Sequence, residues 1–359
     1  MTAIFLDNFL SVTVSLIGAV NPATGLGAPL YLAIKDSGDL DGTTSYSSAA
    51  DVAAALAGND ISAQAAVDLT AMFAQSSPPS IVYVATYTVA TPETPSDALD
   101  KAVAAVLPFG VIVQESRTDT DNSLVGTWMS TRTWNYVAVL QSATAGLITS
   151  GKPSTLSAAE VESVVMLYGT ATEPLAAGFA GLISGTSMLN QPLAMHARVK
   201  GVALTALTNA EHTLALANGV GVLEPLVRGS GSTERIISGT LTYGDQGFSG
   251  VATLVYLVSR ITSAIQALVL AKAIKVEPIF ATQNGEAEVE AAIVPILAEL
   301  AAAGHFTPGQ AGTAPNETYL PEGWGISMSS PGSTVVAAVT VLIGQEVTTI
   351  SVPITAEVQ

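Results

Sequence analysis

The segment that most suggests chemistry is the glycine-rich run GSGST at 229–233. A phosphate-binding loop requires the pattern GxxxxGK[ST] between a strand and a helix, because its backbone N–H groups and its lysine hold the phosphates. No lysine follows these glycines, and the next residues, TLTY at 240–243, have the composition of a strand. We therefore interpret GSGST as a turn.

Candidate metal ligands are scattered along the chain. The three histidines, His196, His212 and His305, show neither HxH nor HExxH spacing, and no cysteine is present to complete a zinc site. The acidic runs at 36–42 (DSGDLDG) and 118–122 (TDTDN) gather carboxylates as calcium loops do, but neither matches the EF-hand pattern. We expect solvated turns at both runs, and no metal or other cofactor.

No combination of nucleophile and base stands out either. The sequence lacks the GxSxG elbow of serine hydrolases. Glu286, Glu288 and Glu290 open an expected helix, where the helix dipole favours negative charge and no catalytic role is required. The residue types and spacings therefore predict that the chain is not an enzyme.

The composition narrows the function classes further. Hydrophobic residues make up 49% of the 359 residues and charged residues only 11%, so Ser, Thr, Gly, Asn and Gln must cover the surface. The net charge of -17 disfavours nucleic acids and anionic membranes, since both attract basic patches. We identify no apolar run of about 18 residues that would span a bilayer. We also expect no signal peptide, because the first residues, MTAIFLDNFL, lack a basic region.

Charge is distributed unevenly along the chain. Seven of the twelve basic residues lie between Arg198 and Lys275, whereas nine acidic residues and no basic residue follow Lys275. The C-terminal stretch cannot form ion pairs within itself. We expect the preceding basic band to be its electrostatic complement.

The elements that would carry these residues follow an alternating pattern between 29 and 190. Apolar strand-like runs are separated by helical patterns, which indicates βαβ units and an α/β domain. The expected strands are 29–34, 79–88, 109–116, 135–141 and 164–169, and the expected helices are 49–58, 61–77, 96–107, 124–130 and 173–184.

Residues 191–333 have a different pattern, which predicts a second, mixed α+β domain. A hairpin or meander is expected at 228–250, followed by a long helix at 251–275 and another at 285–304. The Gly- and Pro-rich stretch 307–332 reads as irregular coil. The overall fold class is thus α/β in the first domain and α+β overall.

Both ends of the chain have the period-two pattern of strands on tethers. Residues 1–28 place Val12, Val14 and Leu16 on one side of a short strand before a Gly/Pro linker. Residues 334–359 end in a second strand, whose apolar side consists of Ile350, Val352, Ile354 and Val358. Such arms could add to the sheet edge of a neighbouring chain. Alternatively, both could pack on their own domain.

Several segments together resemble the tail sheath proteins of contractile-tailed, myophage-type bacteriophages. The resemblance rests on GLGAPLYLAI, SYSSAADVAAALAG, AVDLTAMFAQSSPPSIVYVATYT, RTWNYVAVL, VKGVALTALTNAEHTLALANGVGVL, GDQGFSGVATLVYLVSRITSAIQALVLA and KVEPIFATQNGEAEVEAAIVPILAELAAAGHFTPG, in this order. Each motif is weak by itself, and their order and spacing over roughly 330 residues carry the resemblance.

The resemblance implies a non-enzymatic structural subunit of the virion tail, assembled in the host cytoplasm. Such subunits form hexameric rings stacked around a tail tube, with baseplate and tail terminator proteins as further partners, and contract to drive the tube through the host envelope. It also implies that 29–190 faces outward and 191–333 faces the tube. The alternative class is a secreted or surface-lattice protein, whose uncharged surface would look alike.

The long helix carries the residues that we consider for the tube contact. Arg260, Lys272 and Lys275 lie on it, the last two at its C-terminal end. Lys272 and Lys275 could simply complement the dipole of that helix. The other interpretation is that the three residues face an acidic tube.

Overall fold

The computed structural model describes most of the chain as two compact units. The α/β unit comprises the described residues up to 255, and the C-terminal unit comprises those from 256 onward. The described residues are 26–35, 42–88, 93–132, 135–151, 163–188, 198–203, 207–227, 233–238, 248–275, 279, 282–311, 318–330, 334–343, 346–348 and 354–357.

The α/β unit is built on a six-stranded sheet with the order β2-β3-β1-β4-β5-β6. All neighbouring strands are parallel except β2, which is antiparallel to β3. The inner strands are buried on both faces and are therefore continuous apolar runs, which is why the sequence predicts them well. The strands are β1 (Ala28–Ile34), β2 (Thr43–Tyr46), β3 (Val82–Tyr87), β4 (Phe109–Gln114), β5 (Val137–Ser142) and β6 (Val164–Tyr168).

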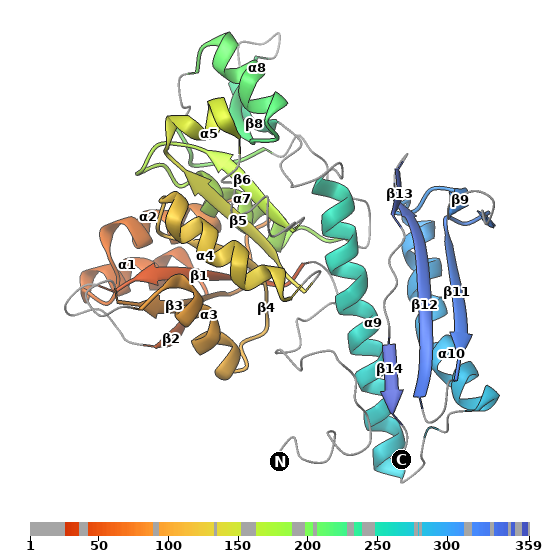
Figure 1. The fold of residues 1–359 in the computed structure, drawn as a ribbon. Helices are drawn as coiled ribbons and strands as arrows, with labels where there is room; N and C mark the ends of the chain where they lie inside the picture. Colours follow the sequence, from red (N-terminus) through yellow and green to blue (C-terminus); the bar gives the residue numbers. More distant parts are fainter. Residues whose placement is uncertain are drawn as a thin grey trace. The chain divides into compact units, whose positions relative to one another are not determined.

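Helices cover both faces of this sheet (Figure 1). α2 and α7 pack on one face, while α3 and α4 pack on the other. Ser48, Ser62 and Thr118 cap α1, α2 and α4 by accepting a backbone N–H in the first turn. The helices are α1 (Ala49–Ala57), α2 (Ala63–Phe73), α3 (Pro95–Ala104), α4 (Asp119–Ser130), α5 (Ala145–Ser150) and α7 (Leu175–Gly185).

The start of α4 corrects one expectation. The run TDTDN at 118–122 is not a solvated turn, because Thr118 is the N-cap and the following four residues form the first turn of the helix. Asn122 is fully buried. The other acidic run, at 36–42, lies almost entirely outside the described residues.

The α/β unit continues beyond residue 190, where we expect the boundary between the outer and inner domains. It includes α8 (Asn209–Ala217) and an antiparallel hairpin of β7 (Val222–Val227) and β8 (Thr233–Ser238). The segment before β7 is joined to the edge of the sheet, since the Tyr168 N–H donates to the Gly221 carbonyl at 2.9 Å. GSGST falls between β7 and β8, so a strand rather than a helix follows it. A phosphate loop is therefore excluded.

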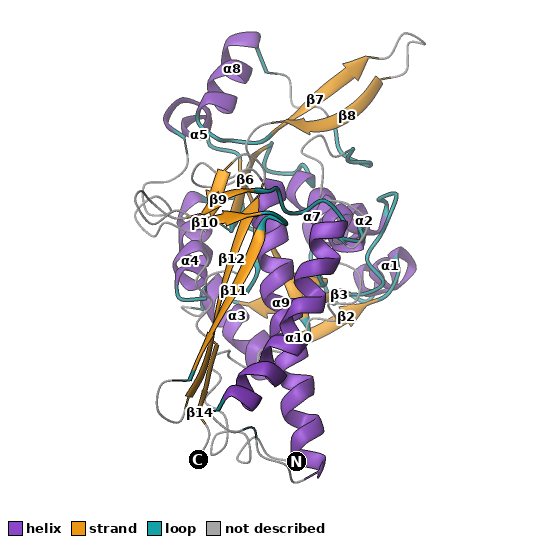
Figure 2. Ribbon diagram, turned by 90° about the vertical axis from the view of Figure 1, so that its right-hand side faces the viewer, coloured by secondary structure: helices purple, strands orange, loops and turns teal. Residues whose placement is uncertain are grey.

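Two long helices and four short antiparallel pairings make up most of the C-terminal unit (Figure 2). The helices are α9 (Phe248–Lys275), which spans the boundary between the units, and α10 (Gln283–Ala302). β9 (Gly309–Ala311) pairs with β10 (Thr318–Leu320). A four-stranded sheet is formed by β11 (Trp324–Ser329), β12 (Thr334–Ile343), β13 (Glu346–Thr348) and β14 (Ile354–Glu357).

β12 is the central strand of that sheet. It pairs with β11 on one side and with both β13 and β14 on the other. Its alternate residues Val335, Ala337, Val339 and Val341 are buried, and α10 packs against β11 and β12. The expected coil at 307–332 is therefore wrong in part, because it contains β9, β10 and β11. These short strands have few buried residues and carry little apolar signal.

Among the described helices, α9 alone is long and apolar enough to cross a membrane by length and composition. An 18-residue window within it has a mean hydropathy of 1.7, a feature that the sequence analysis missed. Leu254, Leu257, Ile261 and Ile265 on this helix are buried within the protein. Over the whole 18-residue window, 33% is buried inside the structure.

Candidate functional site

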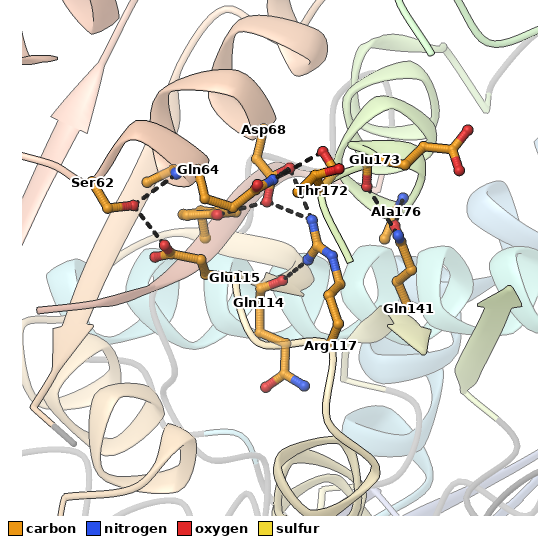
Figure 3. A network of polar contacts seen from close by, with 12 residues as sticks. Ser62, Gln64, Asp68, Gln114, Glu115, Arg117, Gln141, Thr172, Glu173 and Ala176 are labelled. Atoms are coloured by element: carbon orange, nitrogen blue, oxygen red, sulfur yellow. Dashed lines mark hydrogen bonds and ion pairs between the residues drawn. The ribbon is translucent and has the colours of Figure 1, made fainter. Parts of the chain in front are cut away.

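The strand order of the α/β unit defines where a ligand site would be expected. The chain moves from β1 to β3 in one direction and from β4 through β6 in the other, so the order reverses between β1 and β4. Doubly wound sheets bind ligands outside the carboxyl ends of their strands at this point. In this chain the same place holds a dense set of polar side chains (Figure 3).

A buried ion pair lies at the centre of this set. Arg117, just after β4, donates from Nη2 to both carboxylate oxygens of Asp68 on α2, at 2.7 and 2.8 Å. The Tyr31 hydroxyl donates to Asp68 at 2.7 Å and the Gln64 amide donates at 3.1 Å. Asp68 is 0% exposed and Arg117 is 8% exposed. Burial raises the pKa of Asp68, and the guanidinium of Arg117 partly offsets this effect.

Glu115 makes a second link between the same elements. Its carboxylate accepts from the Ser62 hydroxyl at the start of α2 and from the Ile34 N–H at the end of β1, the latter at 2.8 Å. Burial raises the pKa of Glu115, while these two hydrogen bonds oppose the shift. Glu115 therefore ties β1, β4 and α2 together at their ends.

Gln141 makes a corresponding link at the neighbouring strand β5, to the helix α7 that packs on the same face as α2. At the end of β5, its Nε2 donates to the carbonyls of Thr170 and Glu173, and its Oε1 accepts from the Ala176 N–H at 3.0 Å. The start of α7 is thereby held against the sheet, as Figure 3 shows.

This arrangement fills the usual ligand position of the fold with the chain's own side chains. Both oxygens of Asp68 and of Glu115 already accept hydrogen bonds from within the protein. A general acid or base needs an oxygen within reach of a substrate, whereas Asp68 is 0% and Glu115 is 7% exposed. Among the described residues, no group of three or more His, Asp and Glu side chains could hold a metal ion. The cluster is suited to fixing the fold.

Sequence reasoning missed this cluster. Asp68 lies 49 residues before Arg117, so no local spacing relates them. The one available signal is a charged run, ESR at 115–117, directly after a buried apolar strand. Charges in that position are either ligand groups or a buried pair, and only the tertiary structure shows which.

The expected strand arms are described only in part. Val12, Val14, Leu16, Ile350, Val352 and Val358 lie outside the described residues. Ile354 begins β14 and is opposite Ala337 of β12 in the same chain. The terminal strand thus has a partner within its own sheet when the chain is alone.

The three basic residues considered for the tube contact differ in their surroundings. Arg260 pairs with Glu299 of α10 at 2.7 Å, and Lys272 pairs with Glu288 of α10 at the same distance. Two residues of the basic band therefore pair with carboxylates of the acidic C-terminal stretch, as the charge distribution predicts. Lys275 is exposed at the end of α9 and has no ion-pair partner among the described residues.

Comparison with known proteins defines the class of fold. No protein-family model and no curated protein matches the sequence. Solved structures do match, among them chains of a contractile sheath and of its baseplate and a sheath tail protein. The fold of this chain is the mixed α/β fold of contractile tail sheath proteins.

The helical sheath of the anti-feeding prophage, solved in its contracted state, has a TM-score of 0.63 and is 14% identical; the match covers 95% of this chain and 93% of that one. A chain of the baseplate of the same particle has a TM-score of 0.59 at 14% identity, with 96% and 94% covered. A sheath tail protein from Listeria innocua has a TM-score of 0.53 at 14% identity, with 71% and 58% covered.

Proposed function

We propose that the chain is a structural subunit of a contractile tail sheath. Its subunits would polymerise as stacked hexameric rings around an inner tail tube and contract to drive the tube through a host envelope. The observation that carries this proposal is the match to a helical sheath protein over 95% of this chain and 93% of that protein. A fold shared over nearly the full length of both chains supports the same kind of role.

Partners and location follow from the same proposal. The subunit would contact its own copies, the tube protein, a tail terminator and the baseplate, within a virion tail assembled in the host cytoplasm. The likeness to a chain of a baseplate structure supports the baseplate contact. The filled ligand position between β1 and β4 supports a structural rather than a catalytic role.

The terminal strands would supply part of the lattice. β14 joins β12 through main-chain pairing along four residue pairs. Main-chain hydrogen bonds do not depend on which copy supplies the strand. The residues around Val12, Val14, Leu16, Ile350, Val352, Ile354 and Val358 would complete such a sheet between neighbouring copies, as arms at 1–28 and 334–359. Because β12 is the centre of the sheet, the exchanged part would lie after Ile343.

The tube contact would lie in the part of the expected inner domain (191–333) that belongs to the C-terminal unit, which begins at Tyr256. Of the three candidates, Lys275 is the best placed, because Arg260 and Lys272 are already neutralised by Glu299 and Glu288. Arg260 and Lys272 would position α9 against α10 through these ion pairs, and Lys275 would be exposed at the end of the helix.

The decisive experiment is electron microscopy of the purified chain, alone and with its tube protein. Tubes with a regular ring repeat are expected. Flat two-dimensional sheets would indicate a surface lattice instead, and discrete monomers at high concentration would contradict any assembly role.

A further inference from the structure

Val106 has a backbone conformation that valine rarely adopts. It follows α3 with a φ of 54°, in the left-handed region where the Cβ atom crowds the backbone and β-branched residues are outliers. The helix ends there with two hydrogen bonds, from the Val106 N–H to the Val103 carbonyl (2.9 Å) and from the Leu107 N–H to the Ala102 carbonyl (3.2 Å). This is the Schellman arrangement, and its left-handed position is usually a glycine.

Other helix ends in the chain make the same turn with residues that suit it. After α10, Gly304 has a φ of 83°, and N–H groups of Gly304 and His305 donate in the same pattern. After α8 the left-handed residue is Gly219, and after α1 it is Asn59, with a φ of 58°. Asparagine tolerates this region well. Val106 is therefore the exception among the described helix ends.

The strained valine gains little from its own chain. Val106 is 62% exposed, and the preceding Ala104 and Ala105 are exposed as well. Leu107 and Pro108 are half-buried, and no charged residue occurs from 102 to 110. The end of α3 is thus an exposed, uncharged, apolar tip, which we call the Val106 tip (104–108). Within the isolated chain, neither burial nor a polar contact compensates for the strain.

The charge of the chain indicates what covers this tip. Each copy has a net charge of -17, so two copies repel one another wherever their acidic surfaces face. Repulsion is weakest, and apolar burial most favourable, at a surface without charges. We propose that the Val106 tip is a contact between copies of this chain in the assembled lattice, and that burial of Val106 in this contact compensates for its backbone strain. The inference rests on the proposed function and identifies one of its interfaces.

A single cysteine tests this contact directly. The sequence has no cysteine, so Val106→Cys places a unique thiol on the tip. Its reaction with a maleimide should be rapid in the unassembled chain and largely lost in assembled particles. Equal reactivity in both states would overturn this inference alone. Failure of the unmodified chain to assemble under any condition would overturn the proposed function together with it.

A pair of glycine substitutions separates strain from contact. Val106→Gly should raise the melting temperature of the unassembled chain by about 2–4 °C, because the strain is removed, yet increase the concentration needed for assembly by about tenfold. Asn59→Gly is the matched control, since its backbone conformation is the same but its side chain is polar. The control should leave assembly unchanged. If Val106→Gly assembles at the same concentration as the unmodified chain, the inference is overturned.

Discussion

Single residues at the carboxyl edge of the sheet hold the α/β unit together through charge. Arg117 and Asp68 are buried together, and Glu115 links β1 and β4 to α2. A buried ion pair adds little net stability compared with apolar packing, because desolvation offsets the attraction. Removing one partner is nevertheless costly, because the other charge remains buried. The cluster therefore selects one arrangement of these elements rather than simply stabilising it.

Substitution of Arg117 tests this view. Arg117→Met should lower the free energy of unfolding by about 3–5 kcal/mol, because Asp68 is left as an unpaired buried charge. The double variant Asp68→Asn/Arg117→Met should recover most of that loss, since the amide oxygen can still accept from Tyr31. Urea unfolding measures both. A double variant as unstable as the single one would show that pairing is not the cause.

Glu115 gives a pH dependence with a definite sign. Burial raises its pKa above the ordinary 4.5, so the folded chain binds this proton at a higher pH than the unfolded chain. The associated stability is present below pH 4.5 and lost as the pH rises through the folded pKa. Compared with Glu115→Gln, the melting temperature of the unmodified chain should therefore fall as the pH rises above about 4.5.

Asp97 is the control for this titration, because its shift has the opposite sign. Hydrogen bonds from Thr94 lower the pKa of Asp97 below its ordinary 3.8. The stability that it contributes is present above pH 3.8 and lost as the pH falls through the folded pKa. The difference between the unmodified chain and Asp97→Asn should hence be flat from about pH 4.5 to pH 7. A slope of the same sign for both variants would contradict the assignment to Glu115.

Whole elements are positioned by close backbone contact as well as by charge. α7 carries Gly178, Gly181 and Gly185 along its length. A Cβ atom at Gly181 would lie 2.5 Å from the Cα of Met72 on α2, and one at Gly185 would overlap the Ser77 carbonyl oxygen. The glycines therefore let α7 approach the end of α2 more closely than any larger residue would permit.

Gly181→Ala should lower the free energy of unfolding by about 1–3 kcal/mol, because the added methyl group overlaps backbone that cannot move aside easily. Gly146→Ala is the matched control on α5. There the nearest atom to an added Cβ is Thr144 Cγ2 at 3.6 Å, and alanine should raise stability by up to about 1 kcal/mol. Thermal melts of the two variants check the prediction. Equal effects would mean that helix propensity, rather than close packing, determines the stability of both variants.

For the whole molecule, the terminal strand decides whether the chain is self-contained. β14 pairs with its own β12 along four residue pairs, and the same pairing would join two copies if the strand crossed between them. The pairing depends on main-chain hydrogen bonds alone, so a strand from either copy can make it.

Truncation after Gln345 removes β13 and β14 and tests this point. We expect a decrease in melting temperature of only a few degrees, because β12 keeps its pairing with β11 and its packing against α10. Large assemblies should be lost completely. Melting and sedimentation velocity measure the two effects.

The control variant Thr355→Ser/Glu357→Gln keeps the main-chain pairing and should assemble normally. A large decrease in the melting temperature of the truncated chain would show that the strand belongs to its own monomer.

The sequence determined the elements whose signal is local. The buried strands at 82–87 and 109–114 are continuous apolar runs, and the long helices have regular apolar spacing, so their patterns identify them directly. β2, with the sequence TTSY, and the short strands β9 and β10 were missed, because edge strands of three or four residues carry little apolar signal.

Only the tertiary structure decided the features that depend on residues distant in sequence. The pairing of Asp68 with Arg117 brings together side chains 49 residues apart, and the strain at Val106 comes from how α3 ends, which its apolar composition does not show. The sequence by itself determined that the chain is acidic, contains no cysteine and has an α/β pattern. It also showed that no residues have the spacing of a known catalytic motif. The structure decided that its ligand position is filled and that β12 is a core strand, because both follow from packing between elements rather than from local pattern.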